Sequence, residues 1–148
     1  MTAMLLVHGT CVEIDGIGVL IIGPSGAGKS DLAVRLLDAG AWLVADDYLW
    51  LEASDGELVA AVPETIAGLL EVRGLGIVRH AYRDTCIVRL CVELVDVKDV
   101  PRLPPEGQTI SYESISIKHV ALNAFEASTV AKVKLAVRAV RDGIVLTE

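Results

Sequence analysis

The chain has 148 residues, of which 53% are hydrophobic; this suits one domain with its own core and argues against disorder. With 20 acidic against 13 basic residues its formal net charge is -7, so nucleic acid is not an expected partner. No apolar stretch approaches a membrane span, and the 3 cysteines form no Cys-x-x-Cys pair, so we expect a cytoplasmic protein with reduced, mostly buried thiols and no membrane association.

The N-terminal segment is predicted to form short strands. Residues 4–7 and 11–14 are apolar and β-branched, with alternation in the second segment. Asp15-Gly16 signals a tight turn. Residues 19–22 are a continuous apolar run, as a strand buried on both faces requires. We interpret these segments as a hairpin leading into a central strand.

A helix and a second hairpin are predicted next. From Lys29 the apolar residues recur with a helical period, and Gly40 stands where such a helix would end. Residues 43–45 have the composition of another buried strand. Residues 49–51 and 58–62 flank a Ser-Asp-Gly turn and are predicted to pair as a hairpin.

The second half of the chain gives weaker patterns. Residues 74–76 read as a loop because they contain two glycines, and residues 101–107 read as a surface loop because they contain three prolines. Residues 86–95 and 115–122 are predicted strands. Ser128 is expected to cap a final helix, whose apolar stripe would be Val130, Val133, Val137 and Val140.

Residues 23–30 fit the phosphate-loop pattern Gly-x-x-x-x-Gly-Lys-[Ser/Thr]. Glycines let backbone N–H groups converge on phosphate oxygens, and the following helix points its positive end at the same anion. Lys29 supplies a cation for the β- and γ-phosphates, and the Ser30 hydroxyl can ligate Mg²⁺. We therefore predict a site for ATP and Mg²⁺. Its nucleotide-binding residues are Gly23, Pro24, Ser25, Gly26, Ala27, Gly28, Lys29 and Ser30.

Asp46 and Asp47 directly follow the predicted buried strand. A phosphoryl transferase needs a carboxylate for its metal and often one that accepts the proton of the attacking hydroxyl. Because adjacent residues on a strand point to opposite sides, the two aspartates are expected to have different tasks, or one of them none. Taken alone, a solvated Asp-Asp at a strand exit is an equally good reading.

Together, the order and spacing of these motifs resemble the C-terminal catalytic domain of HPr kinase/phosphorylase. The resemblance is close over about residues 5–79. It rests on His8-Gly9, the phosphate loop, Leu43-Val44-Ala45-Asp46-Asp47 and Glu71-Val72-Arg73-Gly74-Leu75-Gly76-Ile77. It implies an ATP-dependent kinase for a serine of HPr, the small phosphocarrier protein of the sugar phosphotransferase system.

The resemblance also implies residue roles. Asp46 corresponds to the base that takes the serine proton, and His8 to the histidine that pairs with it, since an imidazolium holds a carboxylate ionised. Arg73 corresponds to the arginine that stabilises charge during transfer. The implied catalytic residues are thus Asp46, His8, Lys29 and Arg73. The implied Mg²⁺ ligands are Ser30, Asp47 and Glu71.

Two features differ from the long members of that family. The chain starts almost at the catalytic motifs, so residues 1–148 are expected to be a single catalytic domain without an N-terminal regulatory domain, as in the short, alphaproteobacterial-type form. The family's Gly-Arg-Asn signature, linked to dephosphorylation, is replaced by residues 122–128. We therefore expect kinase activity and leave phosphorolysis open; Lys118, His119 and Lys132 are nearby cations.

The expected fold is α/β, with a mixed sheet packed by the phosphate-loop helix and the C-terminal helix. Hairpins before and after the loop do not fit a purely parallel order. The resemblance implies a phosphoenolpyruvate carboxykinase-like arrangement of the loop and, from the hexamers of long members, a homo-oligomer.

Two other functions stay open. A P-loop kinase of a small metabolite would need an arginine-rich lid, for which Arg79 and Arg83 are the clustered candidates. A non-catalytic nucleotide sensor would keep Lys29 and Ser30 but would need no base.

Overall fold

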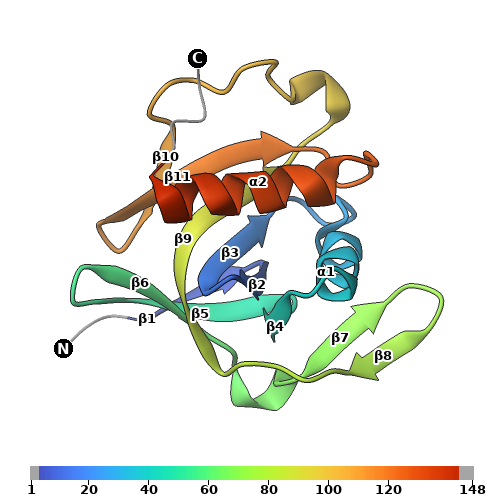
Figure 1. Ribbon diagram of the computed structural model, residues 1–148. Helices are drawn as coiled ribbons and strands as arrows, with labels where there is room; N and C mark the ends of the chain where they lie inside the picture. Colours follow the sequence, from blue (N-terminus) through green and yellow to red (C-terminus); the bar gives the residue numbers. More distant parts are fainter. Residues whose placement is uncertain (1–3, 144–148) are drawn as a thin grey trace.

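The computed structural model describes residues 4–143, in which a large curled sheet carries two α-helices and a separate hairpin projects beside it (Figure 1). The strands of the large sheet are β1 (Met4–His8), β2 (Thr10–Ile14), β3 (Ile17–Ile22), β4 (Trp42–Ala45), β5 (Tyr48–Ser54), β6 (Glu57–Ala61), β9 (Thr85–Leu94), β10 (Thr109–Tyr112) and β11 (Ile115–Leu122). The projecting hairpin is β7 (Leu69–Val72) and β8 (Gly76–Arg79). The helices are α1 (Lys29–Asp38) and α2 (Thr129–Asp142), and short 3-10 turns lie at Glu64–Ile66 and Val97–Asp99.

The sheet is mixed, as predicted. Its strand order is β1-β5-β6-β9-β3-β2-β4, and β11 joins β9 and carries β10. The long strand β9 runs parallel to β3 and to β11, whereas β6 pairs antiparallel with the first half of β9. Because β6 and β11 share one edge of β9, the sheet forks there and curls. The antiparallel hairpins exclude the purely parallel order, as expected.

The first hairpin is confirmed, with a correction to its partners. Asp15 and Gly16 both have positive φ, at 51° and 80°, and β2 pairs antiparallel with β3 across them. Residues 4–8 form a strand but take no part in this hairpin: β1 pairs with β5 instead. The cause is His8-Gly9, where the chain passes from one strand to the next without a tight turn.

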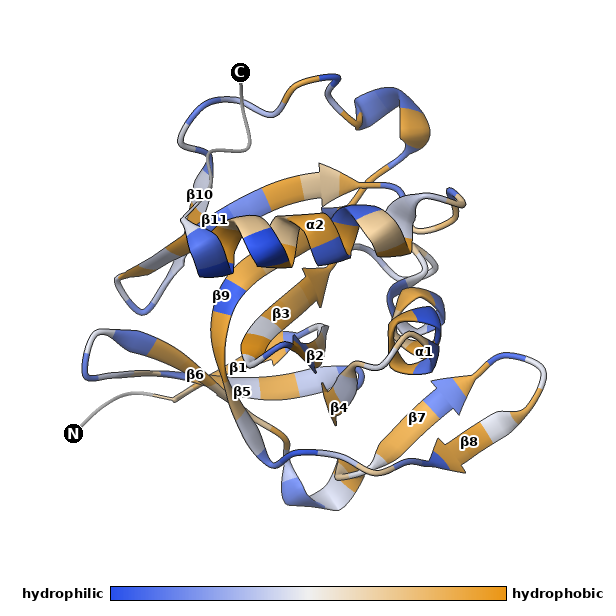
Figure 2. Ribbon diagram, viewed as in Figure 1, coloured by the Kyte–Doolittle hydropathy of each residue, from blue (hydrophilic) through white to orange (hydrophobic). Residues whose placement is uncertain are grey.

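The core has two halves, one on each face of the sheet. Val19 and Ile21 pack toward the helices with Leu32 and Val133, while Leu20 faces the interior of the curl. This alternation explains why the segment around β3 is apolar at every position. Figure 2 shows hydrophobic residues dominating β3 and alternating hydrophobic and hydrophilic bands along α2.

The final helix has the predicted stripe but not the predicted cap. Val133 and Val137 are buried. Ser128 stands at the N-cap position, yet its side chain makes no capping hydrogen bond and its backbone is already helical. The hydroxyl of Thr129 instead donates to the carbonyl of Asn123, so the turn before the helix is held by the next residue.

The structure also shows how the other predicted segments fold. The strand at 43–45, the hairpin around residues 54–56 and the strands at 86–95 and 115–122 are confirmed. The predicted loop at 74–76 is the turn of the β7–β8 hairpin, in which Gly76 already pairs with Val72. Neither described helix is long and apolar enough to cross a bilayer.

Candidate functional site

The phosphate loop connects the end of β3 to the start of α1. The N–H of Ala27 donates to the carbonyl of Pro24 at 3.0 Å, and Gly26 and Gly28 have φ of 83° and 99°. Gly28 must be glycine for two reasons. Its positive φ disfavours any other residue, and a Cβ there would lie 2.7 Å from Ala124 Cβ. Since α1 begins at Lys29, its free N–H groups and positive dipole end face the loop, as anion binding requires.

Lys29 is folded back over the loop. Its Nζ donates to the carbonyl of Gly23 at 2.8 Å and to that of Pro24 at 3.2 Å. These carbonyls hold the ammonium group at the mouth of the loop. A phosphate oxygen is a stronger acceptor for an ammonium than a neutral carbonyl, so the same group is positioned to turn toward an anion bound there.

Asp46, at the end of β4, is buried and hydrogen-bonded by three donors. Its Oδ1 accepts from the hydroxyls of Ser30 at 2.8 Å and Thr10 at 3.0 Å, and its Oδ2 accepts from the N–H of Glu71 at 3.2 Å. The donors come from β2, α1 and β7, so this carboxylate joins three elements. Burial without such donors would be costly for a charged group.

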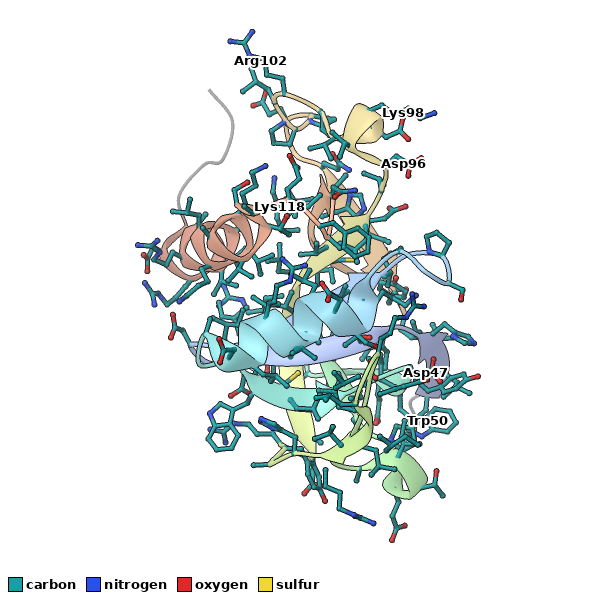
Figure 3. The ribbon with its side chains drawn as sticks, turned by 90° about the vertical axis from the view of Figure 1, so that its right-hand side faces the viewer. Asp47, Trp50, Asp96, Lys98, Arg102 and Lys118 are labelled. Carbon is teal, nitrogen blue, oxygen red and sulfur yellow. The ribbon has the colours of Figure 1, made fainter. Side chains whose placement is uncertain are left out.

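Asp47 occupies a different environment from Asp46. It is exposed, has a φ of 80°, and lines the cleft beside the loop. Its carbonyl accepts from the N–H of Gly9 at 3.0 Å. Figure 3 shows the Asp47 side chain below the phosphate loop, far from Asp96, Lys98 and Arg102 on the segment after β9. The two aspartates are therefore placed differently, and the prediction that their tasks differ remains a prediction.

The expected pair of His8 and Asp46 is not formed. The ring of His8 packs on that of Tyr48, with centroids 4.3 Å apart, and in the described residues no hydrogen bond or ion pair joins His8 to Asp46. The reason is the strand register: β1 places His8 opposite Tyr48, just beyond the two aspartates. The chain between them is tied by Gly9 and Asp47.

Glu71 and Arg73 reach the site from the β7–β8 hairpin. Both are exposed and line the cleft together with Gly74 and Gly76. Within residues 4–143, Arg73 makes no ion pair, so its guanidinium is available to an anion in the cleft. The hairpin thus forms one wall of the site and brings one charge of each sign.

The cleft that collects these groups has a volume of about 620 Å³. Its lining includes most of the predicted nucleotide-binding and catalytic residues, whereas His8 is absent from it. A second cavity of about 660 Å³ lies where β6 and β11 diverge and is lined by Arg89 and Lys118, away from the phosphate loop. Of these two cavities, only the cleft beside the phosphate loop contains the loop and the buried Asp46 carboxylate. We therefore place the phosphate chemistry in that cleft.

Within residues 4–143, the cleft offers oxygen ligands for Mg²⁺ but no complete protein cage. In the described part of the chain, no three His, Cys, Asp or Glu side chains converge to hold an ion. Mg²⁺ in phosphoryl-transfer sites is bound by one or two carboxylates together with phosphates and water, so a complete protein cage is not needed. The Ser30 hydroxyl and the Asp46 carboxylate, 2.8 Å apart, fit such a shared site.

Two residues of the site were missed by sequence reasoning. Thr10 is fully buried and donates to Asp46; the signal was a second polar residue, besides Glu13, in a strand of otherwise apolar residues. Phe125, the single phenylalanine of the chain, lines the cleft from the turn before α2 and had no pattern around it.

The three cysteines are free and buried, as expected. Burial, together with the nearby Glu93 charge, raises the pKa of Cys91 to about 12.

Comparison with known proteins shows which proteins the chain is similar to. The chain is 46% identical over 71 residues to an HPr kinase/phosphorylase of Clostridium botulinum (strain Eklund 17B), covering 48% of this chain and 23% of that protein. It is 52% identical over 73 residues to an HPr kinase/phosphorylase of Geobacillus sp. (strain WCH70), covering 49% of this chain and 24% of that protein. The chain thus spans about a quarter of the length of these relatives.

The likeness extends to a solved structure and to the family as a whole. A structure of the Hpr(Ser) kinase/phosphatase from Coxiella burnetii superposes with a TM-score of 0.84 at 26% identity, covering 95% of this chain and 92% of that one. The family described as HPr Serine kinase C-terminal domain matches residues 1–144. The phosphate loop, the two aspartates and the Glu71–Ile77 segment therefore stand in a chain that belongs to the HPr serine kinase C-terminal domain family.

Proposed function

We propose that this chain transfers the terminal phosphate of ATP to a serine of an HPr-type phosphocarrier protein. The observation that carries the proposal is the direct hydrogen bond of 2.8 Å between Ser30 of the phosphate loop and Asp46, in a cleft that also holds Asp47 and Arg73. A nucleotide-binding loop and carboxylates in one cleft are what phosphoryl transfer requires. Family membership supports the same reaction.

In the proposed reaction the loop N–H groups and Lys29 bind the phosphates, and Arg73 approaches from the hairpin to neutralise charge on the group in transfer. Mg²⁺, held at Ser30 and a neighbouring carboxylate, would supply further neutralisation when bound. The serine oxygen forms a bond to the γ-phosphorus as the bond to the ADP oxygen breaks. The serine proton passes to a carboxylate of the site.

The carboxylates can divide this work in two ways. The family resemblance assigned the proton to Asp46 and the metal to Asp47 and Glu71. The surroundings favour the reverse for the aspartates: Asp46 is buried and bonded to Ser30, a proposed metal ligand, whereas Asp47 is exposed to the cleft. We therefore propose that Asp46 positions Ser30 and the metal, and that Asp47 takes the proton.

Two conservative variants separate these assignments. With Asp47 as base, Asp47→Asn should lower transfer about 10²- to 10⁴-fold and leave ATP affinity nearly unchanged. Asp46→Asn should weaken Mg²⁺-dependent ATP binding itself. A variant set in which Asp46→Asn loses transfer but keeps binding, while Asp47→Asn keeps its rate, would instead assign the proton to Asp46. Lys29→Ala should weaken ATP binding in either case.

The acceptor is tested directly. Purified protein, ATP and Mg²⁺ are incubated with an HPr-like protein and, separately, with small hydroxyl acceptors. Phosphoserine on the carrier supports the proposal. Label only on a small molecule would indicate a metabolite kinase, and ATP binding without transfer would indicate a nucleotide sensor. Repeating the carrier reaction with added inorganic phosphate tests phosphorolysis, for which the Gly-Arg-Asn signature is missing.

Several finer expectations belong to the same proposal. We propose that the matched residues act as one catalytic domain, that the loop is arranged as in phosphoenolpyruvate carboxykinase, and that the protein works in the cytoplasm as a homo-oligomer. The mixed sheet and the TM-score of 0.84 with the Coxiella burnetii structure support a fold like that of the HPr kinase C-terminal domain. Sedimentation of the purified protein tests the oligomer.

A further inference from the structure

The cleft has an aromatic wall that the proposed reaction does not use. Phe125 lines the cleft although 64% of its surface is exposed. A Cβ on Gly28 would lie 2.8 Å from Phe125 Cζ and 3.1 Å from Cε1, so one edge of the ring rests on the phosphate loop. A single exposed apolar side chain needs no explanation in general, but this ring borders the predicted phosphate site.

The ring is presented by a backbone that is held in place. The N–H of Phe125 donates to Asn123 Oδ1 at 3.0 Å, and Asn123 Nδ2 donates to the carbonyl of Val95 at 3.0 Å. Thr129 donates to the carbonyl of Asn123, and the Arg35 guanidinium donates to that of Ala124. These bonds fix the turn before a ligand arrives, which lowers the entropy lost when a ligand packs on the ring.

The position of the Phe125 ring relative to the carboxylates indicates which part of a nucleotide it would contact. Asp46 contacts the first turn of α1 at Ser30, whereas Phe125 contacts the loop at Gly28. A nucleotide whose terminal phosphate faces the carboxylates must extend its other end away from them. We propose that the ring of Phe125 stacks on the nucleobase of the bound nucleoside triphosphate. This inference rests on the proposed function, since it requires a nucleotide in the loop.

Stacking on one aromatic face has a defined signature. Every base offers a π-face, so the contact adds affinity without strong preference for one base. Replacing a stacking aromatic by alanine weakens binding roughly 5- to 150-fold. Inorganic tripolyphosphate carries the phosphates but no base, so its affinity should not depend on the ring.

The test is calorimetric titration of ATP, GTP and tripolyphosphate, in Mg²⁺ buffer, into four variants beside the wild type. Phe125→Ala and Phe125→Leu should lose affinity for both nucleotides and keep that for tripolyphosphate within about 2-fold. Phe125→Tyr should keep the wild-type affinity for all three ligands. Phe125→Leu covers Gly28 with apolar atoms but has no π-face, so it remains informative if the alanine variant fails to fold. The matched control is Leu135→Ala, which removes an exposed apolar side chain from α2 outside the cleft.

Other outcomes overturn specific claims. Unchanged nucleotide affinity in Phe125→Leu would overturn the stacking contact. An equal loss for nucleotides and tripolyphosphate would also overturn it, because the ring would then only support the loop. A wild type that binds neither ATP nor tripolyphosphate would overturn the proposed function and this inference together.

Discussion

Alanine at Gly28 tests the close contact between the phosphate loop and the turn before α2. Gly28 and Gly26 both have left-handed φ, at 99° and 83°. In this region an alanine Cβ costs about 1–2 kcal/mol at either position. Around Gly26 nothing lies within 4 Å of the added carbon, so the conformational cost is the whole effect. Gly26→Ala is therefore a matched control for Gly28→Ala.

At Gly28 a packing cost is added. The new carbon would lie 2.7 Å from Ala124 Cβ and 2.8 Å from Phe125 Cζ. The phenyl ring can turn aside, but Ala124 is in a turn held by hydrogen bonds, and overpacking of this kind costs about 1–3 kcal/mol. We expect Gly28→Ala to lower the free energy of unfolding by roughly 2–5 kcal/mol, against roughly 1–2 kcal/mol for Gly26→Ala.

Urea denaturation followed by circular dichroism measures both values. Comparable slopes against urea concentration would show that the variants unfold from equally compact states, so their midpoints can be compared. If the two variants lose equal stability, the turn before α2 does not pack on the loop as described. The reasoning about Phe125 as a wall of the cleft would then lose its structural basis.

Three further predictions concern two buried polar side chains and the buried thiol of Cys91. Thr10→Val removes one of the donors to the Asp46 carboxylate and should lower the free energy of unfolding by about 1–3 kcal/mol in urea denaturation; no loss would mean that this bond is not formed. His119→Ala removes a buried ring whose Nε2 lies 2.8 Å from Glu93 Oε1. It should lower the free energy of unfolding by about 1–3 kcal/mol in the same measurement, and an unchanged stability would contradict the pairing. Burial raises the pKa of Cys91 from 9.0 to about 12, so above pH 9 the unfolded chain loses this proton while the folded one keeps it, and stability should fall with rising pH over that window. In Cys91→Ala that part of the alkaline loss should disappear, and an unchanged pH profile would contradict it.

Much of the fold follows from local patterns. The turn at Asp15-Gly16, the helix after Lys29 and the strand at 115–122 were predictable because each depends on the periodicity or turn chemistry of a few neighbouring residues. The partner of β1 was not, since β5 is distant from it in the chain. The β7–β8 hairpin was missed although its strands are neighbours in the chain, because its turn at 74–76 was read as a loop. Ser128 failed as a side-chain cap because Thr129 holds the preceding turn instead.

The candidate site divides along the same line. Residues 23–30 form a contiguous motif whose function is encoded in the backbone, so the sequence alone identified the phosphate loop and, with the aspartates and the Glu71–Ile77 segment, the family. Which aspartate is engaged could not be read from two adjacent identical residues. Their difference arises only when β2, α1 and β7 bring hydrogen-bond donors to Asp46.

What the amino-acid sequence determined by itself was therefore the chemistry available: a loop for phosphates, carboxylates beside it and an arginine on a glycine-rich segment. Tertiary structure decided how that chemistry is distributed, placing His8 against Tyr48, burying Asp46 and setting Phe125 on Gly28. The physical reason is range. Backbone conformation and periodicity act over a few residues, whereas a carboxylate's hydrogen bonds and a ring's packing depend on groups brought together from 16 to 97 positions away.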